Sequence, residues 1–504
     1  MKLVSIAEPQ LILCKDNASA RAMKLVSIAE PQLILCKYLK YFGIGKKNFS
    51  IFAAHSRTRA ATAIRHGGAA RCAMRLRKRH QSMTKDTSYN TVMLPNGLRV
   101  IHRPSPSQVV YCGYAVNAGT RDELPGEEGM AHFCEHMSFK GTTHRRAWHI
   151  MHSLESVGGD LNAFTNKEET VYHAAILRDH IARAVDLLTD IVFHSTYPQA
   201  EIDKEVEVIC DEIESYNDSP ADLIYDEMEN TVFHDSPLGH SILGEARQLR
   251  TFTTADAVRF TSRLYRPGNA VFFAYGDIDF KRLVALLRRA HAIVPDAPNS
   301  ACPDSTAIRS LNMRRQDMSE YRRQDVAKDM HTAQQHVMIA GRAYAATDSR
   351  RMALCLLNNI IGGPAMTSRL NLSLREHNAL VYSVESYMTA YSDTGIWCIY
   401  FGCDAKDTPR CMRLVRRELD KAMLRPLSDT QLRAAKKQIK GQIAVACDNR
   451  EGFAIDFAKT FLHYGTLKDT ARMFALIDAL TPDDLLRAAR DIFDAGTLST
   501  MTIR

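Results

Sequence analysis

Three residues within about one helical turn have the types and the spacing of a metal-dependent hydrolase. His132, Glu135 and His136 stand in the run Ala131-His-Phe-Cys-Glu-His-Met137. Residues at positions i, i+3 and i+4 of a helix share one face, so both imidazoles and the carboxylate would project from a single patch. Imidazoles are common zinc ligands, and a neighbouring carboxylate can take a proton from an attacking water. Because so short a motif also arises by chance, its surroundings have to decide.

A catalytic zinc usually takes a third protein ligand and keeps one position open, so a downstream acidic helix becomes relevant. The stretch Glu201–Glu214 predicts an amphipathic helix with Val206 and Ile209 on its apolar stripe. Glu205 and Glu212 are seven positions apart, which puts them on one face, two turns from each other. Without the upstream motif, an acidic helix turned towards solvent would be the simpler interpretation.

Together the two segments resemble the pitrilysin/insulinase family of zinc metallopeptidases, which includes insulin-degrading enzyme and mitochondrial processing peptidase. In that family the inverzincin motif H-x-x-E-H is followed about 75 residues later by an E-V-x-x-x-x-E helix. Here 76 positions separate His136 from Glu212. The resemblance implies that His132, His136 and Glu212 bind one zinc ion per chain. It also implies that Glu135 is the catalytic base and that Glu205 supports the site from outside the ligand shell.

A second block of the same family covers Gly158–Thr165 and the Glu, Thr and Tyr that follow it, in the pattern G-G-x-x-N-A-x-T-x-x-E-x-T-x-Y. Taken alone, the block is an ordinary glycine turn followed by a strand. By the resemblance, this strand lies at the edge of the active-site sheet, where a substrate peptide adds as a further strand. The substrate-binding residues that it implies are Asn162, Ala163, Phe164 and Thr165.

Further blocks follow in the family's order. Tyr265–Asp277 resembles the strand that closes the first domain, and Gly362–Val384 resembles a block of the second. The resemblance implies that Arg375 and Tyr382 reach an active site from the opposing half-shell. The Tyr382 hydroxyl would stabilise the tetrahedral oxyanion, and Arg375 would hold the substrate backbone or the developing charge. Without the family, both would be interpreted as surface or turn residues.

The order of predicted elements indicates an α+β fold made of one α/β unit used twice, with antiparallel-rich sheets packed against helices. The intervals Val109–Val171 and His336–Ile396, 62 and 60 residues, place equivalent strands in the two halves. Strands are expected near Val100 and at Val109–Val116, Thr170–Leu177, Ala270–Tyr275, His336–Ala340, Gly395–Gly402 and Thr497–Ile503. Helices are expected at the motif, Ile181–Ile191, Glu201–Glu214, around Leu356, Cys411–Leu424, Leu432–Ala446 and from Pro482. The resemblance makes this pair of domains one half-shell of a clamshell peptidase.

Length and charge divide the chain into an extension, two domains and a linker. We expect a catalytic domain at 83–294, a polar linker at 295–328, and a metal-free second domain at 329–504. Residues 1–82 hold 16 Lys and Arg against 3 Asp and Glu, so of 65 basic and 57 acidic residues the remainder keeps 49 and 54. This mildly acidic remainder argues against nucleic acid as a partner.

The basic extension at 1–82 is expected to be disordered or outside the functional enzyme, with Met83 as an alternative start. Its segment Met1–Lys15 recurs unchanged at Met23–Lys37, and a single perfect duplication is not a structural repeat. An Arg-rich, acid-poor leader is typical of mitochondrial transit peptides, so the matrix is the alternative to a cytoplasmic location. The nine cysteines outside the extension include no C-x-x-C pair, which favours a reducing compartment. No apolar run reaches about 18 residues, so no membrane contact is expected.

The sequence therefore predicts a zinc-dependent endopeptidase that cuts extended peptides or presequence-like segments inside a closed chamber. Because the chain supplies one half-shell, a homodimer or a heterodimer with a related chain is expected. Two alternatives stay open. One is a non-catalytic or partner-dependent subunit of a heterodimeric peptidase, and the other is a metal-dependent hydrolase of non-peptide substrates.

Overall fold

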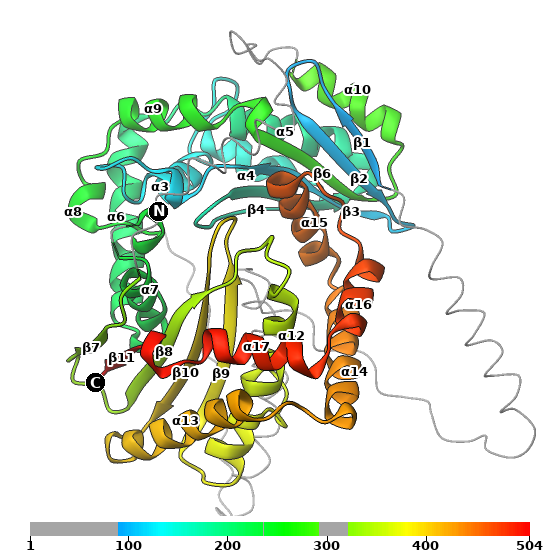
Figure 1. Cartoon of the computed structure of the whole chain (residues 1–504). Coiled ribbons are helices and arrows are strands. Elements are labelled where there is room, and N and C mark those ends of the chain that lie inside the picture. The colour runs from blue at the N-terminus through cyan, green and yellow to red at the C-terminus, as the bar shows by residue number, and fades with distance from the viewer. Residues whose placement is uncertain (1–88, 235, 292–320) are drawn as a thin grey trace, which may run out of the picture. The chain divides into compact units, whose positions relative to one another are not determined.

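A six-stranded and a five-stranded β-sheet organise the computed structural model, which describes residues 89–234, 236–291 and 321–504 (Figure 1). The extension predicted at 1–82 lies outside the described residues. The first sheet has the strand order β1 (Asn90–Met93), β2 (Arg99–Pro104), β6 (Ala270–Gly276), β3 (Val109–Val116), β5 (Thr170–Leu177) and β4 (Asp160–Thr165). The second has the order β7 (Asp325–Lys328), β11 (Ser499–Ile503), β8 (Gln335–Ala343), β10 (Gly395–Cys403) and β9 (Val381–Ala390).

The two sheets repeat one arrangement, as the matching intervals in the sequence predict. In the first, β2 pairs parallel with β6, and the pairs β6–β3, β3–β5 and β5–β4 are antiparallel. In the second, β7 pairs parallel with β11, and β11–β8, β8–β10 and β10–β9 are antiparallel. Each strand of the second sheet therefore has a counterpart in the first, which adds β1 beside β2, and β4 and β9 form equivalent edges. The antiparallel-rich α+β architecture is confirmed.

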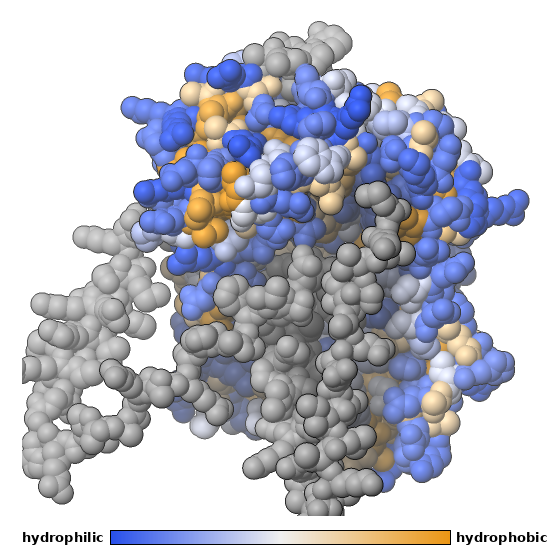
Figure 2. All heavy atoms as spheres, turned by 180° about the vertical axis from the view of Figure 1, so that it is seen from behind, coloured by the Kyte–Doolittle hydropathy of each residue, from blue (hydrophilic) through white to orange (hydrophobic). Residues whose placement is uncertain are grey.

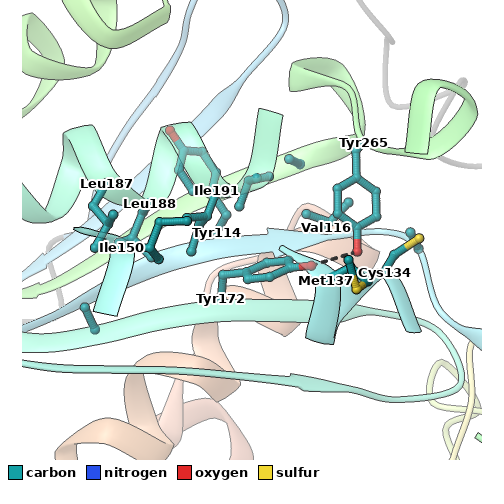
Figure 3. Close-up of a cluster of buried hydrophobic side chains, with 14 of the residues drawn as sticks. Tyr114, Val116, Cys134, Met137, Ile150, Tyr172, Leu187, Leu188, Ile191 and Tyr265 are labelled. Atoms are coloured by element: carbon teal, nitrogen blue, oxygen red, sulfur yellow. Dashed lines mark hydrogen bonds between the residues drawn. The ribbon is translucent and has the colours of Figure 1, made fainter. Parts of the chain in front are cut away.

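Helices of the first half pack on one face of the first sheet, around the apolar core drawn in Figure 3. They are α3 (Met130–Met137), α4 (Ala147–Glu155), α5 (Ile181–Phe193), α6 (Gln199–Asn217), α8 (Ala246–Leu249), α9 (Thr254–Leu264) and α10 (Phe280–His291). Ile150, Leu188 and Ile191 are buried in this core, and the burial of each stabilises the folded protein by about 1.5–3 kcal/mol. The hydroxyl groups of Tyr172 and Tyr265 hydrogen-bond each other inside this core at 3.1 Å, so neither polar group is left unsatisfied.

The second half builds its own core on the equivalent face of the second sheet. Its helices are α12 (Arg351–Gly362), α13 (Thr408–Leu424), α14 (Asp429–Ala446), α16 (Thr470–Ala479) and α17 (Pro482–Ile492). Trp397 of β10 is fully buried, and its indole nitrogen donates to Asn358 Oδ1 of α12 at 2.8 Å. This bond fixes α12 over the sheet without leaving a buried donor unpaired.

Each half also lends a helix to the other half's sheet, which the predicted domain boundaries did not anticipate. Helix α7 (Pro220–Val232) buries Ile224 and Met228 against the second sheet. Helix α15 (Arg450–Tyr464) buries Phe457 against the first sheet, on the face opposite α4 and α5 (Figure 1). Both faces of each sheet are thus covered. The ranges 83–294 and 329–504 separate the strands of the two sheets, but α7 and α15 each pack on the sheet of the other range.

Each predicted strand and helix has a counterpart in the structure, but α4, α7, α15 and several other observed elements were not predicted. β3 and β5 have the predicted bounds, while the ten-residue strand β9 was not predicted. The linker expected at 295–328 is wrong at its end, because Asp325–Lys328 forms β7 alongside β11. The part at 295–320 lies outside the described residues.

The surface seen in Figure 2 is mainly hydrophilic, with apolar side chains gathered in small patches. Among the described helices, none combines the length and apolar character needed to cross a bilayer. Cys134 of α3 is a free thiol and is fully buried in the first core. Burial raises the pKa of the Cys134 thiol well above its usual value, so this residue packs rather than reacts.

Candidate metal centre

Helix α3 separates its two faces by residue type. Its core-facing residues are Met130, Phe133, Cys134 and Met137. The opposite face carries His132, Glu135 and His136, as the i, i+3, i+4 spacing predicts. A helix of eight residues is not stable by itself in water, so packing of the apolar face holds the three polar groups in place.

The N-terminus of α3 is held by a buried carboxylate. Glu123 accepts hydrogen bonds from the backbone N–H of Gly129 at 3.1 Å and of Ala131 at 2.7 Å. The His240 Nε2 atom lies 2.7 Å from the same carboxylate, and burial raises the pKa of Glu123. Gly129 has a φ of 93°, and a Cβ there would lie 2.9 Å from the Cα of Gly244, so only glycine fits. The first N–H groups of the helix are thereby satisfied.

Helix α6 brings the acidic residues to α3. Ile202, Val206 and Ile209 of α6 are buried in the first core, which matches the predicted apolar stripe. This packing turns Glu205 and Glu212 towards the polar face of α3. Both glutamates then contact His136, one through each ring nitrogen.

His132, His136 and Glu212 form the one group of three or more possible ligand residues found among the described positions. Their donor atoms all lie within 4.8 Å of one another. The His136 Nε2 and Glu212 Oε2 atoms are 3.7 Å apart, and the two imidazole centroids are 4.5 Å apart. Ligand atoms about 2.0–2.2 Å from a tetrahedral zinc lie roughly 3.4 Å from each other. Two imidazoles and a carboxylate at this spacing therefore fit zinc in both chemistry and size.

His136 is oriented by a hydrogen bond on the side away from Glu212. Its Nδ1 atom lies 3.0 Å from Glu205 Oε1, and Lys140 Nζ lies 2.5 Å from Glu205 Oε2. Burial alone would raise the pKa of Glu205, but the hydrogen bonds from His136 and Lys140 lower it, so the carboxylate stays ionised. An ionised Glu205 fixes the proton of His136 on Nδ1 and leaves Nε2 free to act as a ligand.

Glu135 lies beside this group in a buried position. Its carboxylate accepts a hydrogen bond of 2.6 Å from the Thr165 hydroxyl at the end of β4. Burial raises the pKa of Glu135, and the hydrogen bond from Thr165 partly opposes that rise. A carboxylate with a raised pKa is a stronger base, which is the property that proton abstraction from water requires.

The residues predicted to bind substrate lie on β4, which is an edge strand of the first sheet as expected. Asn162, Ala163 and Phe164 are half-buried, and the Asn162 side chain accepts from the backbone N–H of Ala163. Thr165 is buried, and its hydroxyl faces Glu135. The edge of β4 offers backbone groups to an incoming strand, and its Thr165 end adjoins the metal centre.

Arg375 and Tyr382 lie together in the second half. Arg375 follows α12 in the short π-helix Asn371–Glu376, and its guanidinium lies 6.0 Å from the Tyr382 ring centroid. Tyr382 belongs to the edge strand β9, and 69% of its surface is exposed. The two residues are thus grouped with each other on the second sheet, while the possible metal ligands come from α3 and α6.

Several residues that support the site were not found by sequence reasoning. Glu123 accepts from the backbone of α3, Lys140 contacts Glu205, and the His240 ring contacts Glu123, yet none of the three belongs to a motif. Glu123 precedes the helix by seven residues and caps it through a loop, so the usual capping signal of a polar residue directly before the helix is missing.

Comparisons with known proteins agree with this geometry. Residues 99–246 match the family described as Insulinase (Peptidase family M16), and residues 251–439 match the Peptidase M16 inactive domain. The chain is 32% identical over 400 residues to an uncharacterized zinc protease of Streptomyces coelicolor, covering 79% of this chain and 86% of that protein. It is 29% identical over 411 residues to the β subunit of the mitochondrial-processing peptidase of Blastocladiella emersonii, covering 80% and 85%.

Solved structures share the fold. A protease from Helicobacter pylori superposes with a TM-score of 0.74 at 20% identity, covering 83% of this chain and 99% of that one. A peptidase M16 inactive domain from Pseudomonas fluorescens gives the same TM-score at 19% identity, covering 82% and 97%. The resemblance inferred from the motifs is confirmed, and the chain belongs to the insulinase family of peptidases, peptidase family M16.

Proposed function

We propose that this chain is a zinc-dependent endopeptidase. The observation that carries the proposal is the convergence of His132, His136 and Glu212 within 4.8 Å, beside the buried Glu135. Relatives named zinc proteases support the choice of metal. One zinc ion per chain would be held by the two imidazole Nε2 atoms and the Glu212 carboxylate. When bound, zinc supplies a Lewis acid that acidifies water and polarises a carbonyl.

The reaction requires a base, and Glu135 is suited to that role. Its carboxylate would take a proton from the attacking water and later deliver a proton to the leaving amine. The Thr165 hydroxyl holds one oxygen of Glu135, so the other oxygen stays available for the proton. Glu205 keeps His136 in the required tautomer throughout.

The edge strand β4 suits an extended peptide as substrate. A peptide that pairs with the backbone of β4 would run alongside Asn162 and Ala163 towards Thr165. Such pairing depends on hydrogen bonds to the peptide main chain rather than on side-chain contacts, so peptides of varied sequence would bind. We infer that peptides, including presequence-like segments, are the substrates, and that non-peptide esters or amides would lack these contacts.

Completion of the site calls for a second half-shell. Arg375 and Tyr382 are grouped on the second sheet, and the exposed Tyr382 hydroxyl is free to face another chain. We propose that they serve the metal centre of a partner chain, either a second copy or a related subunit, within a closed chamber. The similarity to the β subunit of a mitochondrial-processing peptidase supports the heterodimeric form, and the complete ligand set supports a homodimer equally.

Replacement of the base tests the proposed function. Glu135→Gln should retain zinc, measured by elemental analysis, because all three ligands remain. Hydrolysis of a quenched fluorescent peptide should fall by roughly 10²–10⁴-fold, because general-base catalysis is lost. A variant that keeps more than about a tenth of the wild-type rate would reject Glu135 as the base.

A further inference from the structure

The turn between β4 and β5 carries three successive charged residues that are all buried. The side chains of Lys167, Glu168 and Glu169 are only 4%, 6% and 6% exposed. A buried charge is costly unless it is paired. Glu169 contacts Lys459 Nζ at 2.7 Å and His463 Nε2 at 2.9 Å, both from α15, and these contacts hold the pKa of Glu169 below its usual range although burial opposes them.

Glu168 connects this turn to the equivalent turn of the second sheet. Its carboxylate accepts hydrogen bonds from the backbone N–H of Ser392 at 3.0 Å and the Ser392 hydroxyl at 2.7 Å. Arg121 lies 2.7 Å from Glu168 and also donates to both oxygens of Asp393, at 2.7 and 2.5 Å. Ser392 and Asp393 form the β9–β10 turn, so the tips of two equivalent hairpins are joined by one guanidinium.

Arg121 and the β4–β5 turn are connected to the candidate metal centre through two short series of hydrogen bonds. Arg121 is two positions from Glu123, which caps α3, and the Arg121 backbone N–H donates to the Lys167 carbonyl at 2.8 Å. Lys167 in turn donates to the carbonyl of His240, the residue whose ring contacts Glu123. On the other side of the turn, Thr165 directly precedes it and bonds Glu135 at 2.6 Å.

We propose that Asp393, a residue of the second half, is a positioning residue for catalysis in the first. Its carboxylate fixes Arg121, and Arg121 fixes both the segment that caps α3 and the turn that ends β4. Loss of the carboxylate would let these two supports of Glu135 shift together. The inference rests on the proposed function, because it concerns the placement of the proposed base.

A simple structural bond between the halves would behave differently, and a matched variant separates the two cases. Glu227 of α7 contacts Lys328 Nζ of β7 at 2.8 Å, so this ion pair also joins the halves. The side-chain hydrogen bonds and ion pairs of these two residues, among the described positions, do not reach α3 or β4. Glu227→Gln and Asp393→Asn are both acid-to-amide changes of one partner in an inter-half ion pair.

The experiment compares the full-length variants by kinetics, zinc content and hydrogen exchange. Asp393→Asn should lower kcat about ten-fold while KM changes less than about two-fold, because a small displacement of a catalytic group acts on the chemical step. Zinc content should stay at the wild-type level. Amide exchange should rise in residues 119–136 and 160–170 but not in β8 or β10. Asp393→Glu should restore much of kcat, and Glu227→Gln should match the wild type.

The inference would be overturned by a kcat within two-fold of wild type in Asp393→Asn, by an equal loss in Glu227→Gln, or by exchange that rises throughout the chain. A wild-type protein without peptide hydrolysis would instead contradict the proposed function. The exchange comparison remains decisive in that case, since it measures the position of α3 and β4 without turnover. Unchanged exchange at 119–136 and 160–170 would then reject the role of Asp393.

Discussion

At the scale of single residues, the metal centre depends on which side of α6 a glutamate occupies. Glu212 faces His136, whereas Glu207 lies on the exposed side and contacts Arg250 through two bonds of 3.0 and 2.9 Å. Both are helical glutamates five positions apart, so they share composition and local structure. Only the direction of the side chain distinguishes a possible ligand from a surface ion pair.

This difference predicts opposite outcomes for two alanine variants. Glu212→Ala should weaken zinc binding more than roughly 100-fold, because loss of a direct ligand exceeds the 10–100-fold cost of losing an outer partner. Glu207→Ala should bind zinc as the wild type does. Competition against a chromogenic chelator measures both affinities. Equal losses in the two variants would show that the third ligand has been misassigned.

At the scale of elements, α10 is joined to the first sheet by a buried histidine. His291 is 6% exposed, its Nε2 atom lies 2.8 Å from the Tyr114 hydroxyl of β3, and Phe193 of α5 packs against its ring. Burial, with the nearby His194, lowers the pKa of His291 to about 4. The neutral imidazole is therefore favoured in the folded protein.

A lowered histidine pKa predicts a loss of stability in acid. His291 binds its proton near pH 6.5 in the unfolded chain and only near pH 4 in the folded chain. The free energy of unfolding therefore decreases as the pH is lowered from 6.5 to 4. The total contribution is about 3 kcal/mol. Urea denaturation of zinc-free protein at pH 7 and pH 4 should show a fall about 3 kcal/mol larger in wild type than in His291→Gln. Parallel pH dependences would mean that His291 is not buried neutral.

At the scale of the whole molecule, one chain carries a duplicated unit, and the group of possible metal ligands belongs to the first copy. The second copy keeps the strand order, with Tyr382 on its edge strand β9 and Arg375 in the π-helix before that strand. Exchange of α7 and α15 ties the copies to each other. In the proposed two-chain assembly, the possible metal ligands of one chain would face Arg375 and Tyr382 of the other.

Mixed dimers test whether the site is completed between chains. Glu135→Gln and Tyr382→Phe should each be nearly inactive alone. In a hybrid of the two, one centre combines an intact Glu135 with an intact Tyr382 from the other chain, so activity should recover to about half of wild type per hybrid dimer. Peptide turnover after subunit exchange measures the recovery. No recovery, with exchange verified by mass, would place Tyr382 outside the partner's site.

The sequence by itself determined the features that depend on local pattern. β3 and β5 were predicted with their observed bounds because apolar runs between turn residues identify strands. The three polar residues of α3 were placed on one face by helical spacing alone. Their link to Glu212 came from the family resemblance, since the 75 residues between His136 and Glu212 carry no local signal of contact.

Tertiary structure alone decided the features that depend on partners distant in sequence. The run Lys167-Glu168-Glu169 would be assigned to the surface from its charge, yet each residue is buried beside a partner of opposite charge. Glu229 faces Lys167, Arg121 pairs with Glu168, and Lys459 and His463 contact Glu169. The exchange of α7 and α15 was also missed, because neither helix was predicted and the sequence of a helix does not specify which sheet it will cover. The sequence specifies which side chains are present and how they are spaced along a helix or strand. Their burial and their charge partners depend on how the whole chain packs.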